Sequence, residues 1–312
     1  MQKTKPTIYI IGAGAIGKTL AVFLKQQGKD IVLLRGHIDN KPACVENIEV
    51  QLSKDEIIRE EITLSCISNY PAFDGIVVLA NKAYGNLSIA ERLRNKVRNS
   101  PLVILQNGLN VELPFTDHKF SHVYRGVLFT TCQSLAENSV KFRPVTASPI
   151  GIISGNEKTL HAIVDQLNNP NLQFISTLNI HSVAWTKTII NCVFNSICPL
   201  LETDNGIFHS NRNALTIAKR IIDECVIIAS LKNIHLNSEE ILEKLLLISR
   251  SSDGQLISTY QDIINKRKTE IESFNFAITG IADLLQKKEL VTETRLLGEL
   301  IQIKSELTSG SV

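Results

Sequence analysis

The stretch that decides the fold is Thr7-Ile-Tyr-Ile-Ile-Gly-Ala-Gly-Ala-Ile-Gly17, near the start of the 312-residue chain. The apolar run is typical of a buried strand, and Gly12, Gly14 and Gly17 follow it as G-x-G-x-x-G. Such glycines allow a tight turn, a close approach of the backbone to a pyrophosphate, and close packing of the next helix. The start of that helix offers N–H groups to phosphate oxygens. The stretch therefore predicts a dinucleotide-binding unit; the alternative is a purely structural turn.

A second parallel strand is indicated by residues 30–35 and ends at Arg35, 18 positions after Gly17. In NAD-binding units an acidic residue near this place holds the ribose 2′-hydroxyl. An arginine suits the 2′-phosphate of NADP instead, because its guanidinium donates paired hydrogen bonds to phosphate. The sequence thus favours NADP over NAD, and the alternative is a solvated loop arginine.

Two further apolar runs, residues 76–80 and 102–105, predict parallel strands that are followed by Lys82 and Asn107. Ligands of such sheets bind outside the carboxyl ends of the strands. We therefore expect Lys82 and Asn107 to lie with Arg35 at one edge of the sheet, where the amide of Asn107 would face the nicotinamide. The alternative for Asn107 is a simple Asn-Gly turn.

The length of the chain suggests two domains. Strand patterns continue to about residue 178, and we predict a Rossmann-type α/β domain over residues 1–178 and an all-helical domain over residues 179–312. The expected helices of the second domain are residues 182–202, 212–231, 238–250, 255–265, 270–286 and 293–306.

Composition excludes several classes of partner. A net charge of +2 gives no electrostatic basis for binding nucleic acid or a membrane surface. The six cysteines lack a C-x-x-C pair, which argues against a metal site or a disulfide framework and fits a reducing cytoplasm. No apolar signal segment is seen, and the apolar run 183–201 contains Lys187, Asn191 and Asn195, so a membrane span is not expected.

Lys187, Asn191 and Asn195 form a second group of candidate site residues. Their i, i+4, i+8 spacing places them on one face of a helix whose other residues are apolar. A buried polar group without a partner costs roughly 1–3 kcal/mol, and a bound ligand would supply partners. The alternative is a polar stripe satisfied by the protein or exposed to water. A later polar group consists of Ser258, Gln261, Asp262 and Glu270, although Glu270 could simply be a first-turn carboxylate at a helix start.

Taken together, the motifs resemble the ketopantoate reductase (2-dehydropantoate 2-reductase) family over nearly the whole chain. The matching segments are Gly12-Ala-Gly-Ala-Ile-Gly17, Arg35, Lys82-Ala-Tyr84, Gln106-Asn-Gly108, Lys187-x3-Asn191-x3-Asn195, Asn205-Gly206, and Ser258-x2-Gln-Asp262 with Glu270.

The resemblance implies NADPH-dependent reduction of 2-dehydropantoate to (R)-pantoate, on the way to pantothenate and coenzyme A. It implies a helical domain like the C-terminal domain of 6-phosphogluconate dehydrogenase. Lys187 matches the general acid, and Glu270 matches a carboxylate near substrate and cofactor. The implied cofactor contacts are Gly12, Ala13, Gly14, Ala15, Ile16, Gly17, Arg35, Lys82, Asn107, Cys132 (through its backbone) and Glu270. The implied substrate contacts are Asn107, Asn191, Asn195, Asn205 and Ser258.

Hydride transfer to a ketone creates an alkoxide, and a positioned lysine ammonium supplies its proton. General acid catalysis of this kind is typically worth roughly 10²–10⁴-fold. The chain departs from the family's pattern at Ile257, at Phe129-Thr-Thr-Cys132 and at Leu290-Val-Thr-Glu-Thr294. These departures leave reduction of another 2-oxo acid as an alternative. A non-catalytic NADPH sensor is less favoured, because a sensor needs no proton donor such as Lys187. The expected partners are a small 2-oxo acid and, if the chain is not a monomer, a second copy of it in a homodimer.

Overall fold

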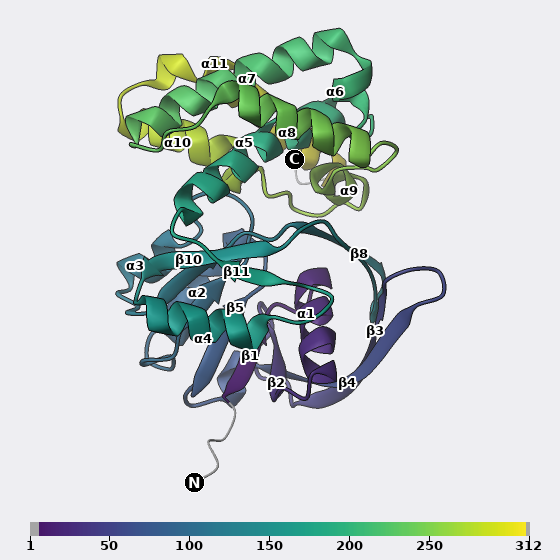
Figure 1. Ribbon diagram of the computed structural model, residues 1–312, viewed down its shortest axis with the longest axis vertical. Coiled ribbons are helices and arrows are strands. Elements are labelled where there is room, and N and C mark those ends of the chain that lie inside the picture. The colour runs from purple at the N-terminus through teal and green to yellow at the C-terminus, as the bar shows by residue number, and fades with distance from the viewer. Residues whose placement is uncertain (1–5, 310–312) are drawn as a thin grey trace. The chain divides into compact units, whose positions relative to one another are not determined.

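The computed structural model describes residues 6–309, which form two compact units (Figure 1). The first unit comprises the chain up to Asn107 together with Val111–Ile180 and is α/β. The second comprises Gly108–Asn110 and the chain from His181 onward and is helical. The predicted fold class, a Rossmann-type domain followed by a helical domain, is confirmed.

Within the described residues, the first unit is built on an 11-stranded sheet with the order β11-β10-β7-β6-β5-β1-β2-β4-β3-β9-β8. Its centre, β7-β6-β5-β1-β2-β4, is parallel. The strands are β1 (Thr7–Ile11), β2 (Ile31–Arg35), β3 (Cys44–Gln51), β4 (Ile57–Cys66), β5 (Gly75–Leu79), β6 (Leu102–Ile104), β7 (Val123–Gly126), β8 (Thr130–Ala136), β9 (Ser139–Pro144), β10 (Ser148–Ser154) and β11 (Phe174–Ser176).

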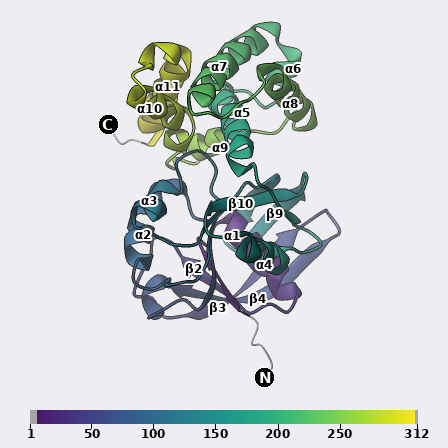
Figure 2. The same cartoon turned by 60° about the vertical axis from the view of Figure 1, so that its left-hand side comes forward.

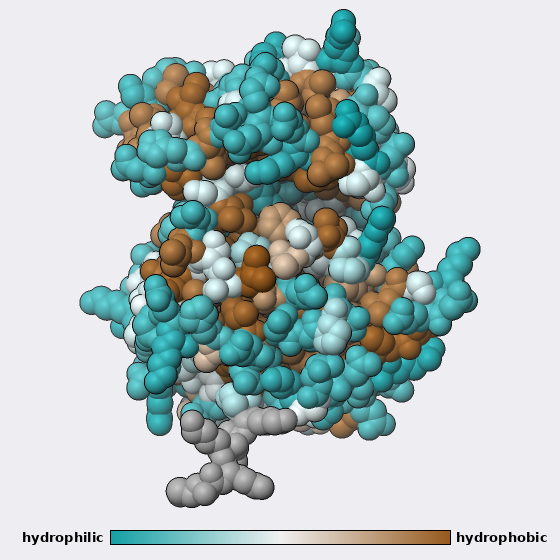
Figure 3. Space-filling view, viewed as in Figure 1, coloured by the Kyte–Doolittle hydropathy of each residue, from teal (hydrophilic) through white to brown (hydrophobic). Residues whose placement is uncertain are grey.

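Helices cover both faces of the parallel centre, which explains why β1 is buried at every position from Ile8 to Ile11. Ile8 and Ile10 lie in one buried cluster, and Tyr9 and Ile11 lie in another. Successive strand residues point to opposite faces, so a sheet covered on both sides needs a continuous apolar run. The first cluster includes residues of α1 (Ala15–Gln26) and α4 (Glu157–Leu167), and the second includes residues of α2 (Asn86–Leu93) and α3 (Leu113–Asp117). On the face shown in Figure 3, hydrophilic residues predominate and apolar residues form separate patches.

The helical unit contains α5 (Ile180–Leu200), α6 (Ile207–Ser210), α7 (Arg212–Leu231), α8 (Ser238–Ser251), α9 (Ser258–Ile264), α10 (Asn275–Leu284) and α11 (Thr292–Ser309). In Figure 2 the pair α10 and α11 lies to one side of α6, α7 and α8, and α7 contacts both members of the pair. Asparagine side chains cap two of the long helices: Asn211 accepts the N–H of Ala214, and Asn237 accepts the N–H of Glu239. Within residues 6–309, none of the helices is both long and apolar enough to cross a membrane.

The helix expected over residues 270–286 is wrong at its start. Glu270 precedes a short 3-10 turn, η3 (Ile271–Ser273), and α10 begins only at Asn275. Phe274 separates them with φ −108° and ψ −97°, which lies outside the helical region. The apolar spacing continues through the break, so periodicity alone predicts one long helix. Glu270 is therefore not a first-turn residue of an α-helix.

Candidate active site

The glycine turn after β1 has the geometry that its sequence predicts. Gly12 has φ +116°, and a Cβ there would lie 2.4 Å from the backbone nitrogen of Asn81. A Cβ on Gly17 would lie 1.9 Å from the carbonyl oxygen of Gly12, because α1 starts directly against the turn. Neither position has room for a side chain, and Gly12 also has a positive φ that other residues rarely adopt.

Gly14 differs from the other two glycines because a Cβ there would have no atom within 4 Å. It is the N-cap of α1 and offers no side-chain cap, and the first turn of the helix has no acidic residue. The first N–H groups of a helix lack intrahelical partners and attract anions. This uncapped helix start beside open space fits the pyrophosphate of a dinucleotide.

The register of the parallel strands brings the predicted cofactor residues to one edge. Ile11, Leu34, Leu79 and Ile104 form one row across β1, β2, β5 and β6. Gly12 and Arg35 directly follow that row, and Lys82 and Asn107 each lie three residues beyond it. The sheet therefore collects the glycine turn, the arginine, the lysine and the amide at the carboxyl ends of its central strands.

Arg35 is held by weak partners. Its guanidinium lies 3.2 Å from Sγ of Cys44 and 3.9 Å from Sγ of Cys66, and 4.0 Å from a carboxylate oxygen of Glu46. Sulfur is a poor hydrogen-bond acceptor and the ion pair is long, so much of the donor capacity of the guanidinium is available to a stronger anion.

Cys132 lies outside this row, on β8, a strand that is last in the sheet order but packs against α1. Its side chain is half-buried and packs against the core cluster that contains Phe142. Burial raises the pKa of the Cys132 thiol to about 12. The thiol is therefore no nucleophile or anionic ligand, and only the backbone of this residue remains a candidate contact.

In the helical unit, the structure joins two of the predicted substrate residues. The side-chain oxygen of Asn195 on α5 accepts hydrogen bonds from Oγ of Ser258 and from the N–H of Thr259, both at 3.2 Å. Its amide nitrogen donates to the carbonyl of Asn191 at 3.1 Å. Asn195 is 1% exposed, so these bonds satisfy a buried amide and bind the start of α9 to the polar face of α5. Lys187 lies two turns earlier on the same face.

Asn205 follows α5 and is fixed through its backbone. Its N–H donates to Gln255 at 3.0 Å and its carbonyl accepts from Oγ of Ser249 at 2.6 Å. A Cβ on Gly206 would lie 1.8 Å from Oδ1 of Asp253, so a larger residue at this position would displace that exposed side chain. Among the described residues, the buried side-chain oxygen of Asn205 has no hydrogen-bond partner. A hydroxyl or amine of a ligand would satisfy it.

Two residues of the later polar group have different surroundings. The carboxylate of Asp262 forms an ion pair with Arg267, with 2.9 Å between Oδ1 and Nε, so it has a partner within the protein. Glu270 directly precedes η3, whose Ser273 carbonyl accepts the N–H of Leu109 at 3.0 Å. The segment Gly108–Asn110, which directly follows Asn107, thus packs against the turn beside Glu270. Sequence analysis did not predict this contact. The only local signal was the Asn107-Gly108 pair, which indicates a turn, and Gly108 has the positive φ of +98° that such a turn needs.

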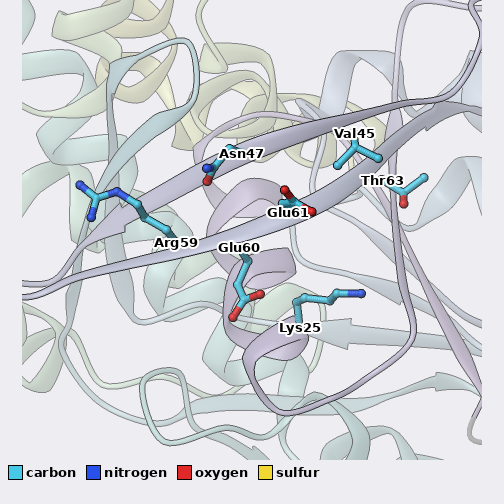
Figure 4. A pocket seen from close by; sticks show the side chains of 7 residues that line it. All are labelled: Lys25, Val45, Asn47, Arg59, Glu60, Glu61 and Thr63. Carbon is cyan, nitrogen blue, oxygen red and sulfur yellow. The ribbon is translucent and has the colours of Figure 1, made fainter.

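A separate pocket of about 500 Å³ lies between α1 and the hairpin of β3 and β4 (Figure 4). Figure 4 shows basic and acidic side chains together around it, and none is a predicted site residue. Lys25 lies in the last turn of α1, at the opposite end of that helix from the glycine turn. The pocket is therefore not part of the candidate site.

Comparison with known proteins identifies the family. The model described as ketopantoate reductase PanE/ApbA matches residues 8–154, and the model described as its C terminal matches residues 179–301. A 2-dehydropantoate 2-reductase of Pyrococcus horikoshii is 28% identical over 311 residues, which cover 97% of this chain and 99% of the relative. One from Streptococcus pyogenes serotype M1 is 26% identical over 302 residues, covering 95% and 97%.

Solved structures share the fold. A D-mandelate dehydrogenase structure superposes with a TM-score of 0.85 at 21% identity, covering 97% of this chain and 99% of that one. A ketopantoate reductase from Staphylococcus aureus, described as dimeric, gives 0.79 at 17% identity with the same coverage. With both parts of the family matched in order, the chain belongs to the ketopantoate reductase PanE/ApbA family of oxidoreductases that act on CH–OH groups.

Proposed function

We propose that the chain reduces 2-dehydropantoate to (R)-pantoate with NADPH, a step toward pantothenate and coenzyme A. The observation that carries the proposal is the polar face of α5. Lys187 and Asn191 lie on it, and it ends at Asn195, whose amide binds Ser258 and Thr259. Such a line on an otherwise apolar helix suits a polar ligand, and the curated relatives of this family carry the name of this activity.

The chemistry divides between cofactor and chain. The reduced nicotinamide, when bound, supplies the hydride. Lys187 donates a proton to the C2 oxygen as negative charge develops there. Asn191, Asn195 and Ser258 orient the carboxylate and hydroxyl groups of the substrate, and Asn195 acts through Ser258, because its own buried amide is hydrogen-bonded within the protein. The unpaired side-chain oxygen of Asn205 accepts a hydrogen bond from a hydroxyl of the substrate.

Two more residues complete the proposed site. Asn107 contacts both nicotinamide and substrate. Glu270 holds either the Lys187 ammonium or a substrate hydroxyl. The pyrophosphate of the cofactor binds at the glycine turn and the start of α1. Lys82 and the backbone of Cys132 provide further cofactor contacts.

The test is the loss of NADPH absorbance on addition of 2-dehydropantoate and of a panel of branched and unbranched 2-oxo acids. We expect the highest kcat/KM with 2-dehydropantoate. A higher value with another 2-oxo acid would assign that substrate, and NADPH binding without turnover on any of them would indicate a sensor. Reduction of a different 2-oxo acid is the second candidate function. It is favoured by Ile257, an apolar residue directly before Ser258. It is also favoured by the D-mandelate dehydrogenase relative, solved with NADH and anilino(oxo)acetate.

Replacing Ser258 with alanine is expected to raise KM for the keto acid about tenfold and to lower the free energy of unfolding by only about 0.5–1.5 kcal/mol, since it removes one hydrogen bond to Asn195, whose oxygen keeps the N–H of Thr259. Replacing Asn195 with alanine will raise KM and also lower the free energy of unfolding by roughly 1–3 kcal/mol, because it leaves the buried N–H of Thr259 without an acceptor. Steady-state kinetics give KM, and urea unfolding gives the free energy of unfolding, for each variant. Equal loss of stability in the two variants would contradict the assignment of Ser258 to the substrate.

Replacing Arg35 with alanine is expected to raise KM for NADPH roughly 10–100-fold and to leave KM for NADH nearly unchanged. A hydrogen bond to a charged group is worth about 1.5–3 kcal/mol, and only NADPH carries the 2′-phosphate. The control is Arg59→Ala, an exposed arginine on β4 that pairs with Glu49 at 3.2 Å. Equal changes for both cofactors would show that Arg35 does not read the 2′-phosphate.

We also place the protein in the cytoplasm. All six cysteines are free, which suits a compartment where thiols stay reduced.

A further inference from the structure

We propose that Asn81, Asn86 and Gln106 are positioning residues for the cofactor. Their side-chain amides form a closed hydrogen-bonded ring, called the amide ring below, that joins the loops after β5 and β6. The ring fixes Lys82 and Asn107 relative to each other. The inference rests on the proposed binding of NADPH at this edge of the sheet.

Three hydrogen bonds close the ring, and among the described residues the buried Oε1 of Gln106 has no partner. Nε2 of Gln106 donates to Oδ1 of Asn81 at 3.0 Å and to Oδ1 of Asn86 at 2.8 Å. Nδ2 of Asn81 closes the ring by donating to Oδ1 of Asn86 at 3.1 Å. The orientation of the Gln106 amide is unambiguous, because turning it over would place its oxygen against two acceptor oxygens.

Burial makes the ring specific. Gln106 is 5% exposed and Asn86 is 2% exposed, so water does not replace a lost bond. A hydrogen bond between buried amides is stronger than one in water, because the surroundings have a low dielectric constant. A packing role alone would be met by apolar side chains of similar size.

Two members of the ring also donate to loop carbonyls, and the third directly precedes a proposed cofactor contact. Nδ2 of Asn81 donates to the carbonyl of Lys82 at 2.8 Å. Nδ2 of Asn86 donates to the carbonyl of Val111 at 2.8 Å, where the chain returns from the Gly108–Asn110 segment. Gln106 directly precedes Asn107, so its position sets that of the proposed nicotinamide contact.

The ring also touches the ends of β1 and β2. A Cβ on Gly12 would lie 2.4 Å from the N atom of Asn81, and one on Gly36 would lie 3.4 Å from its Cβ. Asn81 thus lies where the carboxyl ends of β1, β2 and β5 meet, and Gln106 adds the end of β6. A small shift of the ring would move both proposed contacts at once.

The experiment compares Gln106→Met with Gln106→Glu. Methionine keeps the size but cannot donate, so we expect KM for NADPH to rise about tenfold at every pH, relative to wild type. Glutamate places a carboxylate against two acceptor oxygens near neutral pH, and its protonated form donates one hydrogen bond. Burial raises the pKa of such a carboxyl, so Gln106→Glu should recover several-fold as the pH falls through about 7 to 5. Absence of that recovery, or recovery in both variants, would overturn the proposal.

A second readout needs no cofactor. In Gln106→Met we expect backbone hydrogen exchange to rise together in residues 80–86 and 106–111, with α4 unchanged as the internal reference. A rise in only one loop, or in neither, would also overturn the proposal. If the wild-type protein fails to bind NADPH, the proposed function fails, while the exchange result still decides whether the ring couples the loops.

The matched control is Asn169→Asp. Asn169 is another buried amide of the same unit, 6% exposed, and its Oδ1 accepts the N–H groups of Asn171 and Leu172. We expect this variant to leave KM for NADPH within about twofold of wild type. A rise equal to that in Gln106→Met would mean that loss of any buried amide, and not the ring, weakens cofactor binding.

Discussion

Replacing Lys187 with alanine will lower kcat for keto-acid reduction by about 10²–10⁴-fold and change the Kd for NADPH by less than about threefold. This loss corresponds to roughly 3–5 kcal/mol of transition-state stabilisation. The reason is that Lys187 is proposed to protonate the C2 oxygen, whereas NADPH is proposed to bind mainly at the sheet edge. Stopped-flow or steady-state absorbance gives kcat, and NADPH fluorescence gives Kd.

The control for charge and helix content is Lys219→Ala. Lys219 lies on α7 of the same unit and pairs with Glu239 at 3.1 Å on the surface. A surface ion pair of this kind contributes little, so kcat should stay at the wild-type value. A Lys187→Ala variant that keeps most of its turnover would remove Lys187 from the mechanism.

The second large effect separates two glycines of the same turn. Gly17→Ala should lower the free energy of unfolding by roughly 1–3 kcal/mol or more, because its Cβ would lie 1.9 Å from the carbonyl oxygen of Gly12. It should also abolish NADPH binding. Gly14→Ala should leave stability almost unchanged, since a Cβ there meets no atom within 4 Å.

Gly14→Ala should nevertheless weaken NADPH binding at least tenfold, because the new methyl group occupies the space in which the pyrophosphate approaches the helix start. Thermal or urea unfolding together with an NADPH titration tests the pair. If Gly14→Ala bound NADPH as tightly as wild type, the pyrophosphate would not lie over this turn.

The fold was accessible from sequence because its signals are local. The apolar run of β1, the glycine turn and the strand ends at Arg35 and Leu79 follow one another in the chain, and parallel register then aligns them. The helical unit was accessible for the same reason, since apolar spacing and asparagine caps mark α7 and α8 directly.

The rest depends on contacts between distant residues. The break before α10 coincides with a bond from Leu109 to Ser273, which no local pattern encodes. The bond between Asn195 and Ser258 joins residues 63 positions apart. Asp262 belonged to the same motif as Ser258, yet it pairs with Arg267. Spacing identified polar residues on shared faces but could not tell which of them bind each other.

The most direct test is a crystal structure of the chain with NADPH and a non-reacting analogue of the keto acid. The account predicts Nζ of Lys187 within hydrogen-bond reach, about 2.6–3.2 Å, of the oxygen on C2. It also predicts that the nicotinamide lies on the other side of that carbon. An Nζ that points into solvent, or that binds a carboxylate remote from the analogue, would contradict it.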